Sequence, residues 1–351
     1  MKAAVTNIHT LNKTQAVPFT HLIPDTSANK HFYKNGLSKL IPRLTLKVYT
    51  DMEKCFSLWE AFSPKETLFD EWDVRYSFYQ GFKYKPHFYT IYEGRKALGI
   101  LPLWFNELEK SFEFFGGWWI EGTSFFVTDE HLVDFFMAIL PTPVKLWSLR
   151  KDQPFDRMKV FGKVQTEDDM NYFKNIDGLS SIDSLMKEYK KKDRHNINAD
   201  YQRMRSYGVR LEVVDKNKQA QLQVLEKMFD MNKKRFINTP DKSTFEQEGY
   251  RTAFRQLVKN VGSYDVKFFV AKIQKHIAAI DMVITHNDTY YQFQGVNDIK
   301  RFNGIGNYMV YVELKDAIDN GYKMVDCLQE DHSWKHRYFD KVDRFCFTKD
   351  K

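Results

Sequence analysis

The chain has 351 residues, 43% of them hydrophobic and 16% aromatic, which is enough to bury cores for two ordinary domains. This composition excludes a disordered chain. The formal net charge of +7 is a moderate basicity. It favours an anionic partner such as a nucleotide cofactor, RNA or a membrane surface, without choosing among them.

No uninterrupted apolar run approaches the ~18 residues of a membrane-spanning helix, and the first residues lack the apolar core of a signal peptide. The cysteines Cys55, Cys327 and Cys346 are scattered and form no CxxC unit, which fits a reducing compartment. We therefore expect a cytoplasmic protein with no transmembrane segment and no metal site.

The first half of the chain predicts an arm followed by an α/β module. Residues 1–44 show little periodicity and are expected to form an arm that packs over the first domain or is partly disordered. The elements predicted after the arm are a strand at 44–49, a capping box at 50–53 opening a helix to 62, a hairpin at 88–104 that turns at Glu93-Gly94, strands near 112–115 and 124–127, and a helix at 130–140.

The second half repeats this order. Its predicted elements are a strand at 209–214, a helix at 219–236, a capping box at 243–246 opening a helix to 259, a hairpin at 266–284 that turns near Gln274-Lys275, and strands at 290–296 and 324–328. In the two hairpins Phe268-Phe269 corresponds to Phe88-Tyr89. We predict a duplicated module, with boundaries at 45–175 and 176–351.

The most informative stretch lies between the last two of these strands. Arg301-Phe-Asn-Gly304-Ile-Gly306 joins a strand to a helix whose apolar stripe is Val310, Leu314, Ala317 and Ile318 and which stops at Gly321. A turn of this kind directs unpaired backbone N–H groups and the positive end of a helix dipole at one point. No acid stands in the first helical turn. The pattern predicts a phosphate-binding turn with a vacant anion position, which only the second module has.

The order strand, helix, helix, hairpin, strand, Arg-x-x-Gly-x-Gly turn, helix and strand resembles the GNAT acyltransferase fold. The tandem arrangement is similar to the FemAB-like branch, in particular to acetyltransferases of the CelD type linked to cellulose biosynthesis. The stretches Tyr189–Val213 and Gly321–Tyr338 carry the closer similarity. The resemblance implies two tandem GNAT-like modules of the α/β (α+β) class. Each would have a mixed, mostly antiparallel sheet flanked by helices, the first module being degenerate.

The resemblance also implies direct transfer of an acyl group from a thioester to an amine. The co-substrate would be acetyl-CoA or another acyl-CoA, and the acceptor a small-molecule or cell-envelope precursor amine such as an amino sugar. The residues expected to hold the donor are Gly295, Val296, Asn297, Arg301, Asn303, Gly304, Ile305, Gly306 and Asn307. Among them, the Val296 or Asn297 N–H is the candidate oxyanion donor, and Gly295 marks either close approach of a ligand or a β-bulge.

The proton acceptor is expected at the end of the last core strand. Asp326 on that strand is the first candidate, followed by Glu330, Asp331 and His332 in the acidic turn beyond it. Trp334 and Lys335 are candidates for binding the acceptor, and Lys335 is alternatively a solvated surface lysine.

Two other functions stay open. A FemAB-like transferase would use aminoacyl-tRNA to extend peptidoglycan cross-bridges, and the basic segment 187–210 would suit its tRNA. That segment is alternatively a solvated helix with a buried face. The third reading is a non-catalytic RNA- or membrane-binding protein on a GNAT scaffold.

Overall fold

The computed structural model describes residues 16–23, 27–168, 170–330 and 334–350, without the side chains of 27–29. The chain forms two compact units. The first contains Met1–Tyr79, Lys83–Asp168 and Asp343–Lys351, and the second contains Gln80–Phe82 and Asp169–Val342. No helix of the described ranges is long and apolar enough to cross a membrane.

The first unit is built on a nine-stranded sheet with the order β1-β2-β3-β4-β5-β7-β16-β8, with β6 paired to β4. Its strands are β1 Val17–Pro18, β2 Leu44–Tyr49, β3 Pro86–Glu93, β4 Lys96–Asn106, β5 Ser111–Phe114, β6 Phe126–Val127, β7 Val144–Leu149, β8 Lys163–Thr166 and β16 Phe345–Lys349. Its helices are α1 Phe19–Leu22, α2 Ser27–Lys34, α3 Met52–Phe62, α4 Trp72–Phe82, α5 Leu132–Ala138 and α6 Phe155–Met158, the last three residues of α4 being counted with the second unit.

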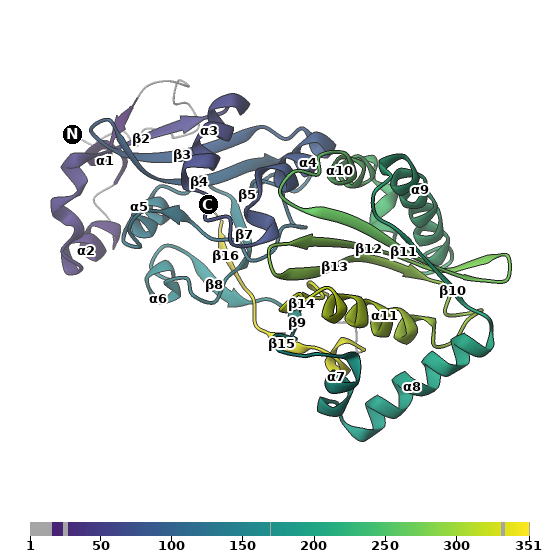
Figure 1. The fold of residues 1–351 in the computed structure, drawn as a ribbon. Helices are drawn as coiled ribbons and strands as arrows, with labels where there is room; N and C mark the ends of the chain where they lie inside the picture. The colour runs from purple at the N-terminus through teal and green to yellow at the C-terminus, as the bar shows by residue number, and fades with distance from the viewer. Residues whose placement is uncertain (1–15, 24–26, 169, 331–333, 351) are drawn as a thin grey trace. The chain divides into compact units, whose positions relative to one another are not determined.

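The second unit has a seven-stranded sheet with the order β10-β11-β12-β13-β14-β9-β15. Its strands are β9 Asn171–Asn175, β10 Arg210–Val214, β11 Asp265–Ile273, β12 His276–His286, β13 Thr289–Asn297, β14 Met324–Asp326 and β15 Asp340–Val342. Its helices are α7 Ile182–Glu188, α8 Lys191–Ser206, α9 Lys218–Arg235, α10 Glu248–Lys259 and α11 Ile305–Asp319. Figure 1 shows α9 and α10 on one face of β11–β13 and α11 on the other.

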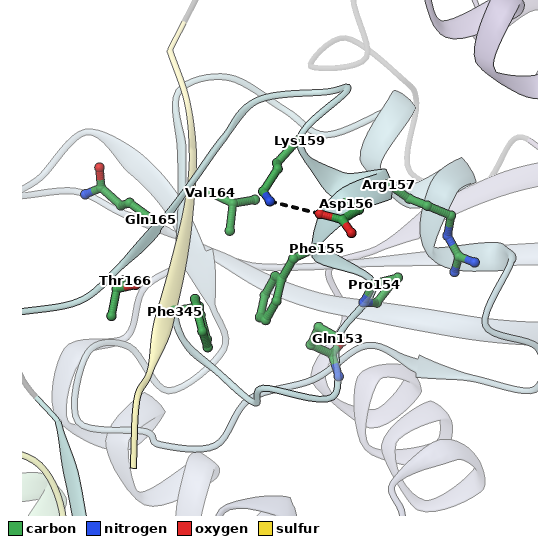
Figure 2. A pocket seen from close by; sticks show the side chains of 10 residues that line it. All are labelled: Gln153, Pro154, Phe155, Asp156, Arg157, Lys159, Val164, Gln165, Thr166 and Phe345. Atoms are coloured by element: carbon green, nitrogen blue, oxygen red, sulfur yellow. Dashed lines mark hydrogen bonds and ion pairs between the residues drawn. The ribbon is translucent and has the colours of Figure 1, made fainter. Parts of the chain in front are cut away.

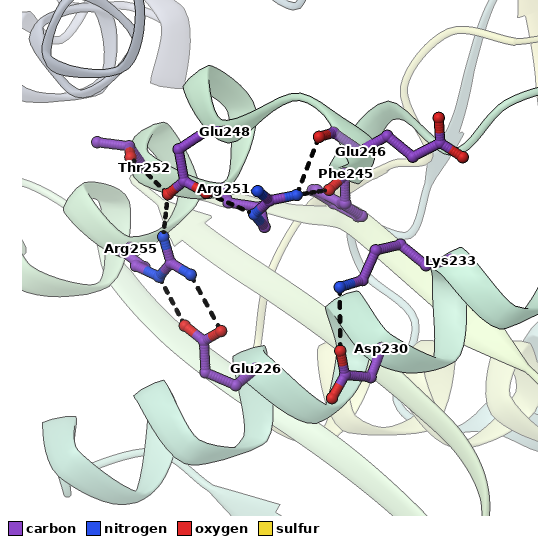
Figure 3. Close-up of polar contacts among 9 residues, drawn as sticks. All are labelled: Glu226, Asp230, Lys233, Phe245, Glu246, Glu248, Arg251, Thr252 and Arg255. Atoms are coloured by element: carbon purple, nitrogen blue, oxygen red, sulfur yellow. Dashed lines mark hydrogen bonds and ion pairs between the residues drawn. The ribbon is translucent and has the colours of Figure 1, made fainter.

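The helices α9 and α10 are joined by a surface ion-pair network. The Arg255 guanidinium donates to both carboxylate oxygens of Glu226 on α9, at 2.6 and 3.1 Å, and to Glu248 on its own helix at 2.7 Å (Figure 3). Beneath this network Phe229, Phe245 and Phe254 pack edge to face or tilted in the core. The helix pair is therefore held mainly by its aromatic contacts, since exposed ion pairs contribute little.

The predicted duplication is visible in the strand register. In the first hairpin Ile91 opposes Gly99, and the register shifts between Ile91 and Tyr92. In the second hairpin Ala271 opposes Ala279, and the register shifts between Ala271 and Lys272. Both hairpins continue through a third antiparallel strand and a helix to a strand that pairs in parallel. Two mixed, mostly antiparallel sheets flanked by helices confirm the predicted fold class.

The domain limits differ from the predicted ones at three places. Position 175 ends β9, which belongs to the second sheet, so the units separate at 168/169. The strand β16 returns to the first sheet between β7 and β8, because its Cys346 and Phe347 are buried there. The described part of the arm is not separate either: Phe19 and Phe32 are fully buried in the core of the first unit.

The buried arm leads to a stability prediction. Replacing Phe32 by Ala should lower the free energy of unfolding by about 3 to 5 kcal/mol, because it leaves a cavity beside the ring of Phe135. Its neighbour Tyr33 is 72% exposed, and Tyr33→Ala should stay within about 0.5 kcal/mol of the wild type. Denaturant unfolding checks both. Equal stabilities would show that the arm does not belong to the core.

Candidate functional site

The strands β13 and β14 pair over only three residues. Residues 289–291 of β13 oppose 324–326 of β14, whereas residues 292 and 294–297 of β13 are paired with β12 alone among the described strands. Beyond Asp326 the chain leaves β13, and the Cys327 N–H donates to the Tyr172 carbonyl of β9 at 2.7 Å. A wedge therefore opens between β13 and β14, with one backbone edge of β13 facing it.

Hydrogen-bond alternation decides which backbone N–H groups face this wedge. The Asp298 N–H donates to the Ala278 carbonyl of β12 at 2.9 Å. Successive N–H groups of a strand point to opposite sides, so those of Asn297 and Gly295 point away from β12, toward the wedge. The Val296 N–H points toward β12 and hydrogen-bonds the Asp281 carboxyl. Of the two expected oxyanion donors, Asn297 is the one whose N–H faces the wedge.

Gly295 lies at a close approach and not at a bulge. A Cβ at this position would be 2.6 Å from Asp281 Oδ1. The irregularity in the pairing of β12 with β13 falls between Met282 and Val283, opposite Phe293. The missing side chain of Gly295 thus makes room for a carboxyl of the neighbouring strand.

The predicted phosphate-binding turn follows β13 directly. The N–H groups of Arg301 and Phe302 donate to the Asp298 carbonyl, which closes the turn, and α11 then begins at Ile305. The backbone N–H groups of Gly304, Gly306 and Asn307 have no backbone acceptor among the described residues. Unpaired donors at the positive end of a fifteen-residue helix are a suitable environment for an anion.

An acid from another helix lies beside this turn, so the expected vacancy is only partial. Asp200 of α8 accepts a hydrogen bond from Asn307 Nδ2 at 2.6 Å and pairs with Arg203 at 2.8 Å. Gly304 has a φ of +95°, and a Cβ there would lie 2.7 Å from the Asp200 carboxyl. A Cβ on Gly306 would come no closer than 3.6 Å, to Asn297 Nδ2. A glycine is therefore required at position 304, whereas position 306 has room for a Cβ.

The side chains of the turn point in different directions. Arg301 is 54% exposed, and its Nη1 donates to His276 Nδ1 at 2.9 Å, next to the hairpin turn of β11 and β12. The backbone carbonyl of Asn303 accepts from Arg203 at 3.3 Å. Ile305 is fully buried in the core, so only its backbone can take part in anion binding.

The acidic end of β14 is shaped by a buried lysine. Lys335 Nζ donates to the carbonyls of Cys327, Leu328 and Gln329 at 2.8, 3.2 and 2.6 Å. Its side chain is 5% exposed. The alternative that Lys335 is a solvated surface lysine was therefore wrong, because its ammonium donates to three carbonyls inside the fold, while its role in binding the acceptor stays a prediction.

The same loop holds strained backbone. Leu328 and Glu330 have φ angles of +55° and +78°, values that non-glycine residues seldom adopt. The half-buried Asp326 carboxylate accepts the Leu328 N–H at 2.9 Å and so helps to fix this turn. Glu330 is exposed. Asp331 and His332 lie outside the described residues.

Trp334 belongs to the core of the second unit. Its ring is 6.4 Å from that of Tyr338 and 6.2 Å from that of Phe339. The Tyr338 hydroxyl in turn donates to Asn307 Oδ1 at 2.9 Å. Trp334 thus supports the helix end that carries the turn.

Two acids that the sequence analysis did not select lie between α11 and the sheet. Glu313 is 3% exposed, hydrogen-bonds Asp281 and accepts from Gln292 Nε2 at 2.6 Å. Burial raises the pKa of Asp281 to about 6 and that of Glu313 well above its usual range. The signal was available, because each acid interrupts an apolar run that faces the core.

A pocket of about 570 Å³ lies in the first unit, on α6, β8 and β16. Phe155, Val164 and Phe345 point toward its centre, with the Lys159–Asp156 ion pair at its rim (Figure 2). It contains none of the predicted site residues.

Comparison with known proteins agrees with this geometry. Residues 191–336 match the family model of the acetyltransferase (GNAT) domain. No curated protein matches the chain significantly. Among solved structures, FemX has a TM-score of 0.50 at 10% identity, covering 77% of this chain and 90% of its own.

Two further structures share the fold. A tandem GNAT protein from the clavulanic acid biosynthesis pathway has a TM-score of 0.50 at 11% identity, covering 87% of this chain and 97% of its own. The C-terminal domain of a protein described as a lysylphosphatidylglycerol synthetase from Agrobacterium fabrum has a TM-score of 0.54 at 9% identity, covering 84% and 91%. The chain thus carries a GNAT domain in a FemAB-like tandem fold. The family match is confined to residues 191–336, and the likeness to these solved structures shows the tandem fold.

The two glycines of the turn should differ in their tolerance of alanine. Gly304→Ala should lower the free energy of unfolding by about 1 to 3 kcal/mol, because a Cβ is strained at this φ and meets Asp200. Gly306→Ala should be neutral or stabilise by up to about 1 kcal/mol, since it is helical with open space. Thermal unfolding of the two variants is the measurement, and equal losses would contradict this description of the turn.

The buried ammonium gives a second prediction. Lys335→Met should destabilise the second unit by about 3 kcal/mol, because it leaves buried carbonyls without a donor. Lys341→Met, at an exposed position of β15, is the matched control and should change stability by less than about 0.5 kcal/mol. Denaturant unfolding compares the two variants. A Lys335→Met protein as stable as the control would refute the structural role.

Proposed function

We propose that the chain is an acyl-CoA-dependent N-acyltransferase that transfers the acyl group directly to an amine acceptor. The observation that carries this proposal is the wedge between β13 and β14 with the phosphate-binding turn at its end. Free backbone donors along β13 can pair with an extended amide-containing arm such as pantetheine. The N–H groups of Gly304, Gly306 and Asn307, with the Arg301 charge, can hold its pyrophosphate.

The reaction needs few groups beyond this arrangement. The acceptor nitrogen attacks the thioester carbonyl carbon, and the Asn297 N–H would donate to the oxygen as negative charge develops on it. The C–S bond then breaks, and the thiolate of coenzyme A leaves. The amine proton passes to a carboxylate, for which Asp326 and Glu330 at the end of β14 are our candidates. Positioning the donor and acceptor supplies much of the rate enhancement.

For the acceptor we propose the amine of an amino sugar or of another cell-envelope precursor. One structural relative is described as a synthetase of lysylphosphatidylglycerol, an envelope lipid, and another is FemX. These proteins share only the fold with this chain at their 9–10% identity. They make envelope amines the first class of acceptor to test.

A second candidate is a FemAB-like transferase that uses aminoacyl-tRNA. Asp200 beside Gly304 adds negative charge near the turn, which weakens the case for a pyrophosphate there. The exposed Lys190, Lys191 and Lys192 have no carboxylate partner within the described part of the chain, so they are available to a polyanion. Binding of RNA without transfer would instead support a non-catalytic role.

Calorimetric titration with acetyl-CoA tests the first proposal. We expect micromolar binding by the wild type and at least about tenfold weaker binding by Arg301→Ala, since a lost charged contact is worth roughly 1.5–3 kcal/mol. Arg235→Ala, an exposed arginine at the end of α9, is the control and should bind as the wild type does. A folded wild type that binds aminoacyl-tRNA but not acetyl-CoA would favour the second candidate.

A further inference from the structure

The two acids between α11 and the sheet lie directly behind the wedge. Asp281 on β12 reaches over Gly295 and accepts the Val296 N–H. Glu313 on α11 hydrogen-bonds Asp281 and is itself held by Gln292 of β13. The pair therefore connects one helix and two strands at the part of β13 that lacks β14 as a neighbour.

Within the described part of the chain, no cation pairs with either acid. Asp316 of α11 faces the same space, and the Lys267 ammonium of β11 pairs with it. That ammonium also lies 4.9 Å from the ring centroid of Tyr290. The buried Glu313 carboxyl and the half-buried Asp281 carboxyl are in hydrogen-bond contact and cannot both be ionised, so the pair shares one proton.

Asp281 and Glu313 lie next to the point where the pairing of β12 with β13 is irregular, and this position gives the two acids a further role. Just before Gly295, the register of β12 and β13 shifts opposite Phe293, and no strand among the described residues pairs with the other edge there. At such a point the orientation of the next peptide groups is weakly specified unless a side chain fixes it. Among the described residues, the Asp281 carboxyl is the side chain that hydrogen-bonds the Val296 backbone.

We propose that Asp281 and Glu313 form a positioning pair for acyl transfer. The protonated Glu313 donates to the Asp281 carboxylate, which holds the Val296 N–H and so keeps the Asn297 N–H directed at the thioester carbonyl. Neither acid touches the substrate. The inference rests on the proposed function, because the direction of the Asn297 N–H matters only if a thioester lies in the wedge.

The test is the carbonyl ¹³C NMR signal of acetyl-CoA labelled at that carbon, bound to the full chain. In the wild type the signal should move downfield on binding, because a hydrogen bond polarises the carbonyl. In Asp281→Ala it should return toward the value of free acetyl-CoA, while the dissociation constant changes less than about threefold, or about 0.7 kcal/mol. Asp281→Asn keeps an acceptor for the Val296 N–H and should restore most of the shift.

The pH dependence separates this role from a merely structural one. The wild-type shift should decrease to about that of Asp281→Asn as the pH falls through about 6, the raised pKa of Asp281, because a neutral acceptor then replaces the carboxylate. Asp281→Asn itself should show no such change. Glu212→Gln, an exposed acid on the edge strand β10, is the control and should behave as the wild type. An unchanged carbonyl shift in folded Asp281→Ala would overturn the proposal. If the alanine variant does not fold, a wild-type shift that stays constant as the pH falls through about 6 would overturn it.

A wild type that does not bind acetyl-CoA would mean that the proposed function has failed. Whether Asp281 and Glu313 share a proton is then tested by thermal unfolding of the wild type and of Glu313→Gln from pH 4.5 to 8. The folded pair retains a proton that the unfolded chain releases, so wild-type stability should fall with rising pH relative to Glu313→Gln. Parallel profiles of the two proteins would overturn the shared proton as well.

Discussion

The short pairing of β13 with β14 is the constraint on which the rest of the second unit depends. A strand in the middle of a sheet normally satisfies its N–H and C=O groups on both sides, and here five residues of β13 have β12 alone as a described partner. Other parts of the unit must therefore hold that edge in place. The turn after β13, the first turn of α11 and the loop after β14 all meet at its ends.

The helix α11 is fixed along its length by polar contacts as well as by its apolar stripe. At its start Asn307 lies between Asp200 of α8 and the Tyr338 hydroxyl. Farther along, Glu313 is bound to Asp281 and Gln292. These contacts keep the positive end of the helix beside the open edge of β13. The basic helix α8 contributes to this directly, with Ile197 and Met204 buried and Tyr201 stacked on Tyr308, so it is a packed helix with a charged outer face.

The first unit repeats the strand order but not the glycine turn that we propose as the anion site. Its helix α5 has seven residues, too short for a strong dipole, and its first turn already contains an acid. That acid, Asp134, is fully buried and pairs with His31 at 3.2 Å and Arg157 at 3.1 Å. The position that could hold a phosphate in the second unit is thus closed here by the protein's own charges. This explains physically why only one module has the turn.

Turn residues, helix caps and hydrophobic periodicity were sufficient to predict many of the helices and strands, because they depend on residues that are near in sequence. They predicted both hairpins and their turns, the helix that ends at Gly321, and the glycine turn before it. The helix at 52–62 was also predicted, although Asp51 and not the predicted Thr50 is its N-cap. Resemblance to a known fold then extended these elements to a tandem arrangement.

Tertiary contacts decided what each polar side chain does. Because lysines are usually exposed, the residue type alone predicts a surface position for Lys335. Only the fold brings three carbonyls to its ammonium. Asp281 and Glu313 are 32 positions apart in sequence and meet only because α11 packs across β12. The return of β16 to the first sheet also depends on residues nearly two hundred positions away. The sequence alone therefore determined the elements and the glycine turn before α11, whereas the partners of buried charges follow from long-range packing that no local pattern encodes.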